Sequence, residues 1–176
     1  MDNTVEKLTD SLKGKDQAKI LYVCLGNICR SPAAEGIMRD MTKKRGIENL
    51  FYLDSAGLYA GHAGELPDHR MRIHASRRGY NLTHRSRPVR TSDFQEFDII
   101  VAMDDSNFDR LRAMAPSLSD EDKVVKMIDF VKGFPYFDHI PDPYYDGDQG
   151  FENVLDLLED GCRNMMEEIY NALESK

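Results

Sequence analysis

The fold is decided by the stretch Val23-Cys24-Leu25-Gly26-Asn27-Ile28-Cys29-Arg30-Ser31-Pro32, which joins an apolar run at 20–23 to a segment with helical spacing. The five residues between Cys24 and Arg30 allow the backbone to curl around a single phosphoryl group. Successive N–H groups and the start of a helix would then point at the phosphate oxygens. The stretch therefore predicts a strand, an anion-binding loop and a helix, in that order.

Cys24 and Arg30 equip this loop for nucleophilic phosphoryl transfer. The sulfur would lie under the phosphorus atom, and the planar fork of Arg30 would bind two phosphate oxygens and stabilise the attacking thiolate. A cysteine beside an apolar strand is more often a small buried hydrophobe, so the context matters. Gly26 and Asn27 readily adopt positive φ, as a tight loop requires, and Ser31 before a proline is typical of a helix N-cap. This context favours the functional interpretation.

The sequence resembles the low-molecular-weight protein tyrosine phosphatases over about residues 18–172. The landmarks occur in the family's order: residues 23–32, Asp54-Ser55-Ala56, Thr83-His84, Ala102-Met103-Asp104-Asp105-Ser106-Asn107 and Asp142-Pro143-Tyr144-Tyr145. The stretch 59–67 departs from the family pattern. The resemblance implies hydrolysis of protein phosphotyrosine and small aryl phosphates through a phosphocysteine, with no metal and no cofactor. The implied partners are tyrosine-phosphorylated proteins or peptides and a cognate tyrosine kinase.

Breaking the phosphate ester requires a proton donor as well as a nucleophile. Asp142 is the candidate, because Pro143 biases it toward an extended conformation. In the family, an aspartate at the matching position protonates the phenolate and then activates the hydrolytic water. The resemblance also implies a set of residues around Cys24 and Arg30. These are the phosphate-binding loop (Leu25, Gly26, Asn27, Ile28, Cys29, Ser31) and a supporting shell (Ser55, His84), to which we add cleft walls formed by Tyr144 and Tyr145 and by Tyr59 or His62.

Alternating strand and helix patterns predict one α/β domain over 18–176, with a four-stranded parallel sheet covered by helices on both faces, in three layers. We expect strands over 19–25, 51–55, 98–103 and 123–127, and helices over 31–45, 68–78, 106–114 and 151–172. The phosphate loop would then lie at the carboxyl end of the first strand, where such sheets bind ligands. Residues 1–17 are expected to form a flexible polar N-terminal extension.

Composition agrees with an intracellular enzyme. The 176 residues are 41% hydrophobic, which is enough for a single core. No apolar run approaches 18 residues and the first residues lack a signal-peptide profile, so we expect a cytoplasmic protein without membrane insertion. The three cysteines show no disulfide or zinc spacing. Cys162 is expected in the core, whereas Cys24 and Cys29 are expected to form a disulfide when the enzyme is oxidised.

Charge is unevenly distributed. The net charge of −8 argues against nucleic acid as a partner. Residues 69–92 nevertheless contain seven arginines, three histidines and no carboxylate, whereas residues 138–176 contain eleven acidic residues and two lysines or arginines. The arginine-rich stretch could be a solvated helix face, a nucleic-acid patch, or a source of positive potential that steers a phosphorylated substrate.

Three other functions compete with tyrosine phosphatase activity. Phosphoarginine phosphatases of the same fold carry Thr where this chain has Ile28, and an apolar residue there suits a phenyl ring better than a guanidinium. Arsenate reductases of this fold need further cysteines close after the loop, and Cys162 is the only other thiol. A non-catalytic phosphotyrosine-binding module would not need Cys24, Arg30 and Asp142 together.

Overall fold

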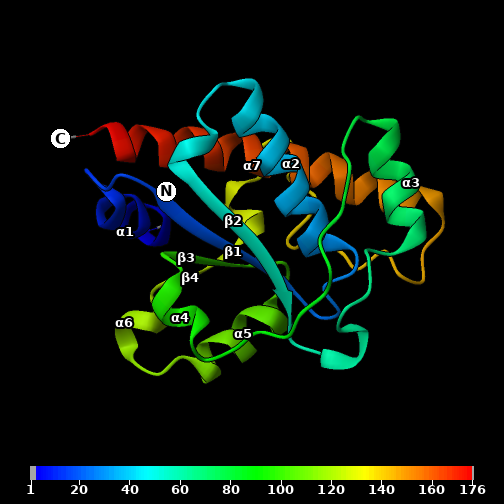
Figure 1. The fold of residues 1–176 in the computed structure, drawn as a ribbon, viewed down its shortest axis with the longest axis horizontal. Helices are drawn as coiled ribbons and strands as arrows, with labels where there is room; N and C mark the ends of the chain where they lie inside the picture. Colours follow the sequence, from blue (N-terminus) through cyan, green and yellow to red (C-terminus); the bar gives the residue numbers. More distant parts are fainter. Residues whose placement is uncertain (1–2, 176) are drawn as a thin grey trace.

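The computed structural model describes residues 3–175, which form one parallel sheet with helices on both faces (Figure 1). The strand order is β2-β1-β3-β4, and every neighbouring pair is parallel. β1 lies in the middle, with Val23 opposite Ala56 of β2 and Ala102 of β3. The strands are β1 (Ala18–Cys24), β2 (Phe51–Gly57), β3 (Ile99–Ala102) and β4 (Val124–Lys126). The predicted α/β class and four-stranded parallel sheet are confirmed.

The helices divide into two layers (Figure 1). On one face lie α2 (Arg30–Lys44) and α7 (Asp148–Glu174), with α1 (Asn3–Leu12) and α3 (His69–Arg77) packed against α7. On the other face lie α4 (Asp93–Glu96), α5 (Asp105–Met114) and α6 (Leu118–Glu121). Three short 3-10 helices complete the fold: η1 (Glu48–Leu50), η2 (Ala60–His62) and η3 (Met127–Phe130). Among the described residues, no helix is both long enough and apolar enough to cross a membrane.

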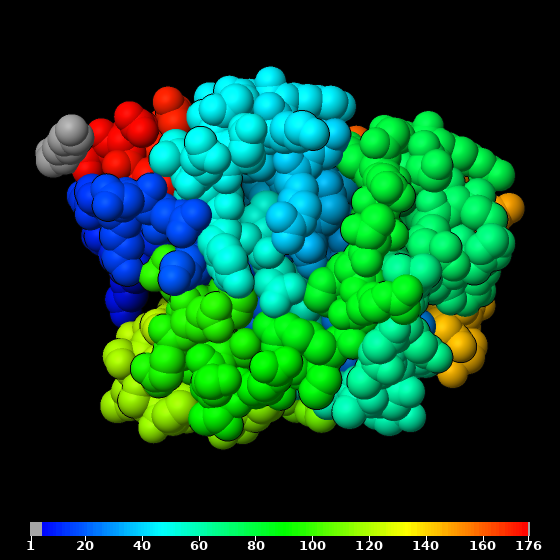
Figure 2. Space-filling view, in the orientation of Figure 1, coloured from blue at the N-terminus to red at the C-terminus, as the bar shows by residue number. Residues whose placement is uncertain are grey.

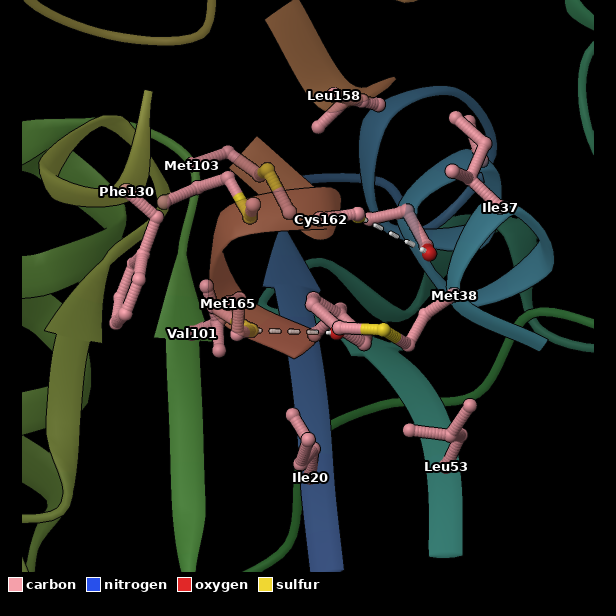
Figure 3. Close-up of a cluster of buried hydrophobic side chains, with 14 of the residues drawn as sticks. Ile20, Ile37, Met38, Leu53, Val101, Met103, Phe130, Leu158, Cys162 and Met165 are labelled. Atoms are coloured by element: carbon pink, nitrogen blue, oxygen red, sulfur yellow. Dashed lines mark hydrogen bonds between the residues drawn. The ribbon is translucent and has the colours of Figure 1, made fainter. Parts of the chain in front are cut away.

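Each face of the sheet has its own core. Ile20 and Tyr22 of β1 face α2 and α7, whereas Leu21 and Val23 face α4 and α5, so the strand is apolar throughout. Figure 3 shows the larger core, in which side chains of β1, β2 and β3 meet those of α2 and α7. There the Tyr22 hydroxyl donates to the sulfur of Met165 at 3.4 Å. Cys162 is fully buried beside α2, which confirms its predicted place in the core.

Residues 3–12 differ from the predicted flexible extension, because they form the amphipathic helix α1. Val5, Leu8 and Leu12 are buried and belong to the larger core. Their spacing of three and four residues places them on one face of the helix, and this face contacts α7. Residues 1–2 lie outside the described part of the chain. The polar composition of the segment concealed a short apolar stripe.

Helix α2 also begins differently from the prediction. Its N-cap residue is Cys29, so the helix starts at Arg30 and Ser31 lies within its first turn instead of capping it. The hydroxyl of Ser31 is therefore free to point back at the loop. The helix ends as predicted, with Gly46 in the left-handed region at φ 70°.

If α1 is part of the core, shortening a side chain on its buried face should destabilise the whole protein. Leu12→Ala removes a side chain with no exposed surface, and we expect a loss of about 2–4 kcal/mol in the free energy of unfolding. Lys13→Ala, at the next and solvent-exposed position, should change it by less than about 0.5 kcal/mol. Urea unfolding measures both. Equal stability of the two variants would show that α1 does not contribute to the core.

Candidate active site

Cys24 is the last residue of β1, and the loop that follows curls over the carboxyl end of the sheet. Its thiol lies at the bottom of a pocket of about 240 Å³. The pocket brings together most of the predicted catalytic, loop and wall residues. Its lining consists of Cys24, Leu25, Gly26, Ile28, Cys29, Arg30, Tyr59, His62, Asp142, Tyr144 and Tyr145. The size and position suit one phosphoryl group with a ring attached to it.

Asn27 determines how the loop turns. Its φ of 56° is the only positive value among the described non-glycine residues, and its side chain is buried. The Nδ2 group donates to Ser31 Oγ at 2.8 Å and to Ser55 Oγ at 3.1 Å. Ser31 Oγ lies 3.0 Å from Cys24 Sγ. Ser31 Oγ also lies 3.5 Å from the Ala56 carbonyl oxygen, so this hydroxyl connects Asn27, the sulfur of Cys24 and the end of β2.

The side-chain oxygen Oδ1 of Asn27 is held from the opposite side. It accepts from the His84 ring at 3.0 Å and from the backbone N–H of Arg87 at 3.1 Å. The other ring nitrogen of His84 lies 3.3 Å from Glu35 and 3.5 Å from Asp54. The predicted supporting residues Ser55 and His84 thus meet the predicted loop residue Ser31 at a single side chain, that of Asn27.

Glu35, Asp54 and His84 lie close enough together to hold a metal ion. Each of them already has protein partners. Glu35 accepts from Ser55 at 2.8 Å and pairs with Arg39, and Asp54 pairs with Arg87 at 3.0 Å. The donor set is therefore that of a hydrogen-bonded ion-pair network that supports the loop.

Arg30 is buried and oriented by Asp104, a residue that we did not predict for the site. Its Nη1 donates to Asp104 Oδ2 at 2.8 Å and to the carbonyl of Ile140 at 2.9 Å. Burial disfavours the charge of Arg30, but the neighbouring Cys24 and Asp104 more than offset this and raise the pKa of Arg30. The other Asp104 oxygen caps α5 by accepting from Asn107 N at 2.8 Å. The sequence at 104–107 is typical of a helix N-cap and so indicates the start of α5, but it does not indicate the contact between Asp104 and Arg30.

Asp142 lies at the rim of the pocket, opposite the loop. Its carboxylate is 3.8 Å from Arg30 Nη2, and 46% of its side chain is exposed. It also accepts from the backbone N–H of Tyr144 at 3.1 Å. The geometry places a carboxylate on the exposed side of the pocket, within reach of both Arg30 and solvent.

The predicted cleft walls form two aromatic pairs. Tyr144 and Tyr145 lie edge to face with ring centroids 5.0 Å apart, and Tyr59 and His62 do so at 5.8 Å. Arg70 stacks over Tyr144 at 5.3 Å. An aromatic substrate ring would therefore have partners on both sides.

Gly57, at the end of β2, is a site residue that sequence reasoning missed. A Cβ atom there would lie 2.9 Å from the Leu25 carbonyl and 3.0 Å from Asn27 Cβ. Any side chain at this position would thus push the loop away from the sheet. The approach joins segments that are distant in sequence, so no local pattern could have indicated it.

Cys29 is buried next to the loop and its thiol is free, as is that of Cys24. Burial, followed by the nearby Asp68 and Cys24, raises the pKa of the Cys29 thiol. It is therefore a poor nucleophile in the reduced enzyme. The disulfide between Cys24 and Cys29 stays a prediction.

The arginine-rich stretch is partly structural. Arg78 pairs with Glu152, Asp156 and Glu159 of α7, and His74 pairs with α7 at Glu152. Arg87 bridges Asp54 and Asp93 beneath the phosphate loop. Several basic side chains of this stretch thus form ion pairs that hold α3 and residues 84–93 in place. The three sequence interpretations did not include this structural role.

Comparison with known proteins identifies consistent relatives. The family model described as low molecular weight phosphotyrosine protein phosphatase matches residues 19–175. A low molecular weight protein-tyrosine-phosphatase of Bacillus subtilis is 38% identical over 85% of this chain and 94% of its own. A protein tyrosine phosphatase structure from Entamoeba histolytica is 42% identical, covers 88% of this chain and 98% of its own, and has a TM-score of 0.85. The structure of a Drosophila arginine phosphatase is 33% identical, covers 85% of this chain and 96% of its own, and has a TM-score of 0.79.

The double role of Asp104 predicts an unusually large loss of stability on its removal. Asp104→Ala removes the α5 cap and also leaves the buried Arg30 without its carboxylate, so we expect the free energy of unfolding to fall by about 2–4 kcal/mol. Ser117→Ala, which removes the cap of α6 and a hydrogen bond to the Asp120 carboxylate but leaves Arg30 paired, should cost about 1 kcal/mol. Saturating inorganic phosphate should bring the loss of unfolding free energy in Asp104→Ala closer to that in Ser117→Ala, because the anion pairs with Arg30. Equal losses in urea unfolding would contradict the role of Asp104 in holding Arg30.

Proposed function

The chain belongs to the low molecular weight phosphotyrosine protein phosphatase family, and we propose that it hydrolyses phosphotyrosine in proteins, with Cys24 as nucleophile, Arg30 as phosphate ligand and Asp142 as general acid and base. The observation that carries this proposal is the set of hydrogen-bonded side chains around Cys24 in the pocket. Cys24 Sγ lies 3.0 Å from the Ser31 hydroxyl, and Ser31 is in turn fixed by Asn27. Arg30 enters the same pocket from the first turn of α2.

In the first step, Cys24 Sγ attacks the phosphorus atom and forms an S–P bond. The bond between phosphorus and the tyrosyl oxygen breaks, its electron pair stays on that oxygen, and the Asp142 proton moves to it. Arg30 and the loop N–H groups stabilise the charge on the transferring phosphoryl group. These groups supply the electrostatic stabilisation from the chain itself, so the proposed mechanism includes no metal.

In the second step, the Asp142 carboxylate takes a proton from a water molecule whose oxygen attacks the phosphorus. The S–P bond breaks, inorganic phosphate leaves, and Cys24 returns to the thiolate. The proton on Ser31 supports the thiolate both as nucleophile and as leaving group. The half-exposed position of Asp142 gives water access to this side of the pocket.

Aromatic pairs on both sides of the pocket support an aryl phosphate substrate over the shorter phosphoserine. The alternative is phosphoarginine, since a Drosophila arginine phosphatase is among the similar structures. Ile28 distinguishes the two. It lines the pocket and presents an apolar surface, which leaves the polar hydrogens of a guanidinium without partners.

We also propose that the enzyme works in the cytoplasm on proteins phosphorylated by a tyrosine kinase. All three cysteines of the chain are free thiols, and the proposed reaction needs a reduced Cys24. A reducing compartment maintains that state.

Side-by-side turnover of phosphotyrosine, phosphoserine and phosphoarginine peptides, with a chelator present, tests the proposal. We expect phosphotyrosine to be preferred and the chelator to have no effect. Cys24→Ser should lose at least about nine-tenths of the activity yet still bind inorganic phosphate, because a hydroxyl without an adjacent base is a poor nucleophile. A folded, reduced wild-type protein that binds phosphotyrosine without turnover would instead be a binding module.

The loss of activity on replacing the general acid should depend on the leaving group of the substrate. For Asp142→Ala we expect kcat on phosphotyrosine to fall about 10²–10⁴-fold. Aryl phosphates with more acidic phenols should lose less, because their leaving oxygens need less protonation. A Brønsted series of substituted phenyl phosphates measures this. A uniform loss across the series would remove Asp142 as the acid.

The identity of residue 28 should set the balance between aryl and guanidinium phosphates. Ile28→Thr introduces a hydroxyl into the pocket wall, so the ratio of kcat/KM for phosphoarginine to that for phosphotyrosine should rise. Ile28→Val, which keeps the wall apolar, is the matched control and should leave the ratio unchanged. If Ile28→Thr behaves like Ile28→Val, residue 28 is not the selector.

A further inference from the structure

The catalytic pocket continues into a groove along α3. The first part of the groove, about 460 Å³, shares Ile28, His62 and Tyr144 with the catalytic pocket. The second part, about 540 Å³, continues from Leu66 and runs between α3 and residues 80–83. We call the whole depression the α3 groove. Its outer lining is Leu66, His69, Arg72, Ile73, Ser76, Arg77, Tyr80, Asn81, Leu82 and Thr83.

The groove follows the length of α3. Residues 69, 72, 73, 76 and 77 recur at three- and four-residue intervals and so occupy one face of the helix. Figure 1 shows the chain after α3 returning beside it, and Figure 2 shows the two segments covering one side of the molecule. At 1.5 Å per residue the nine residues of α3 span about 13 Å, which accommodates about four residues of extended chain at 3.3 Å each.

Three arginines at the groove have no carboxylate within ion-pair distance in residues 3–175. Arg72 donates to the Pro67 carbonyl at 3.0 Å and Arg85 to the Gly64 carbonyl at 2.9 Å, while Arg77 is exposed on α3. Arg78, by contrast, is fully paired with α7. The protein has more acidic than basic residues, with a net charge of −8, yet none of its described carboxylates pairs with these three arginines. Their positive charge is therefore available to a ligand.

Two acidic residues belong to the lining. Glu65 lies 2.5 Å from His62, and Asp68 pairs with Arg70 at 3.1 Å. Both lie in the inner part of the groove, and no carboxylate contributes to the described lining of the outer part. Arg72 and Arg77 thus supply the positive charge of the outer lining.

Apolar side chains lie between the arginines. Leu66 and Ile73 are 36% and 38% exposed, and Leu82 lies at the base of the groove against α2 near Gly36. A compact inorganic anion would make no use of these surfaces. An extended polypeptide that carries both acidic and apolar side chains would use them together with the arginines.

We propose that the α3 groove binds the acidic segment that flanks phosphotyrosine in a protein substrate, and so selects phosphotyrosines with Asp or Glu a few residues away. The inference rests on the proposed function, since the phosphotyrosine anchors the peptide at Cys24 while its flank lies along α3. Arg72 and Arg77 are the specificity-determining residues. They do not touch the reacting atoms, so a small aryl phosphate should be indifferent to them.

The test compares peptides with acidic residues on either side of phosphotyrosine with peptides in which these are replaced by Asn or Gln. For the wild-type enzyme we expect kcat/KM for the better acidic peptide to exceed that for its neutral counterpart about 5- to 10-fold, since each exposed charge pair contributes modestly. High salt should remove the difference. The Arg72→Gln/Arg77→Gln variant should lose the preference while keeping its activity on a small aryl phosphate.

The matched control is Arg112→Gln/Arg163→Gln, which makes the same change in net charge at two exposed arginines outside the groove. It should keep the wild-type preference. The single variant Arg77→Gln changes only an exposed side chain, so it should fold even if the double variant does not. It should lose part of the preference for the acidic peptide. Equal kcat/KM for acidic and neutral peptides, or an equal loss in the control, would overturn the proposal.

Binding to Cys24→Ser separates this inference from the proposed function. If this variant binds the acidic phosphopeptide more tightly than the neutral one, and does so through Arg72 and Arg77, the groove proposal holds even if the wild-type enzyme fails to turn over phosphotyrosine. Equal affinity for the two peptides overturns it. Competition by anionic vesicles or self-association of the chain, without any preference for the acidic peptide, would assign the groove to another occupant and would also overturn it.

Discussion

The active site depends on one backbone conformation, the left-handed turn at Asn27. A non-glycine residue pays roughly 1–2 kcal/mol for this region. Four hydrogen bonds hold the side chain, two donated to Ser31 and Ser55 and two accepted from His84 and Arg87. At about 0.5–1.5 kcal/mol each, these bonds exceed the cost of the turn. The same bonds hold the Ser31 hydroxyl 3.0 Å from Cys24 Sγ, so the curvature of the loop and the surroundings of the thiol have a common origin.

Charge is organised to keep this anion site open in an acidic protein. Arg78 pairs with carboxylates of the acidic helix α7, and Arg87 pairs with Asp54 and Asp93. These arginines offset part of the negative charge near the pocket. Arg30 pairs with Asp104 through Nη1, and its Nη2 lies 3.8 Å from the Asp142 carboxylate. In the proposed complex, Arg30 binds the phosphoryl group despite the overall charge of −8.

Local sequence patterns predicted what local interactions determine. The apolar run before Cys24, the loop residues and the helix ending at Gly46 each carry their own signal, so the strand, loop and helix were found with small errors at their ends. Contacts between distant segments carry no such signal. Asp104 holding Arg30, and Gly57 making room for the loop, depend on the alignment of β1 with β2 and β3. Helix α1 is an intermediate case, because Val5, Leu8 and Leu12 have helical spacing within a polar segment.

The two sides of the pocket differ in rigidity for a chemical reason. In the proposed mechanism Cys24 and Arg30 keep one geometry through both steps. Both are buried, Cys24 beside Ser31 of α2 and Arg30 bonded to Asp104, the N-cap of α5. The acid must give up a proton, admit a water molecule and take a proton back. Asp142 lies on an irregular segment, half exposed and bonded only to its neighbour at Tyr144 N among the hydrogen bonds of the described residues. We therefore expect changes in the rim formed by Asp142, the aromatic walls and the start of the α3 groove to alter substrate selection more than they alter the phosphate site.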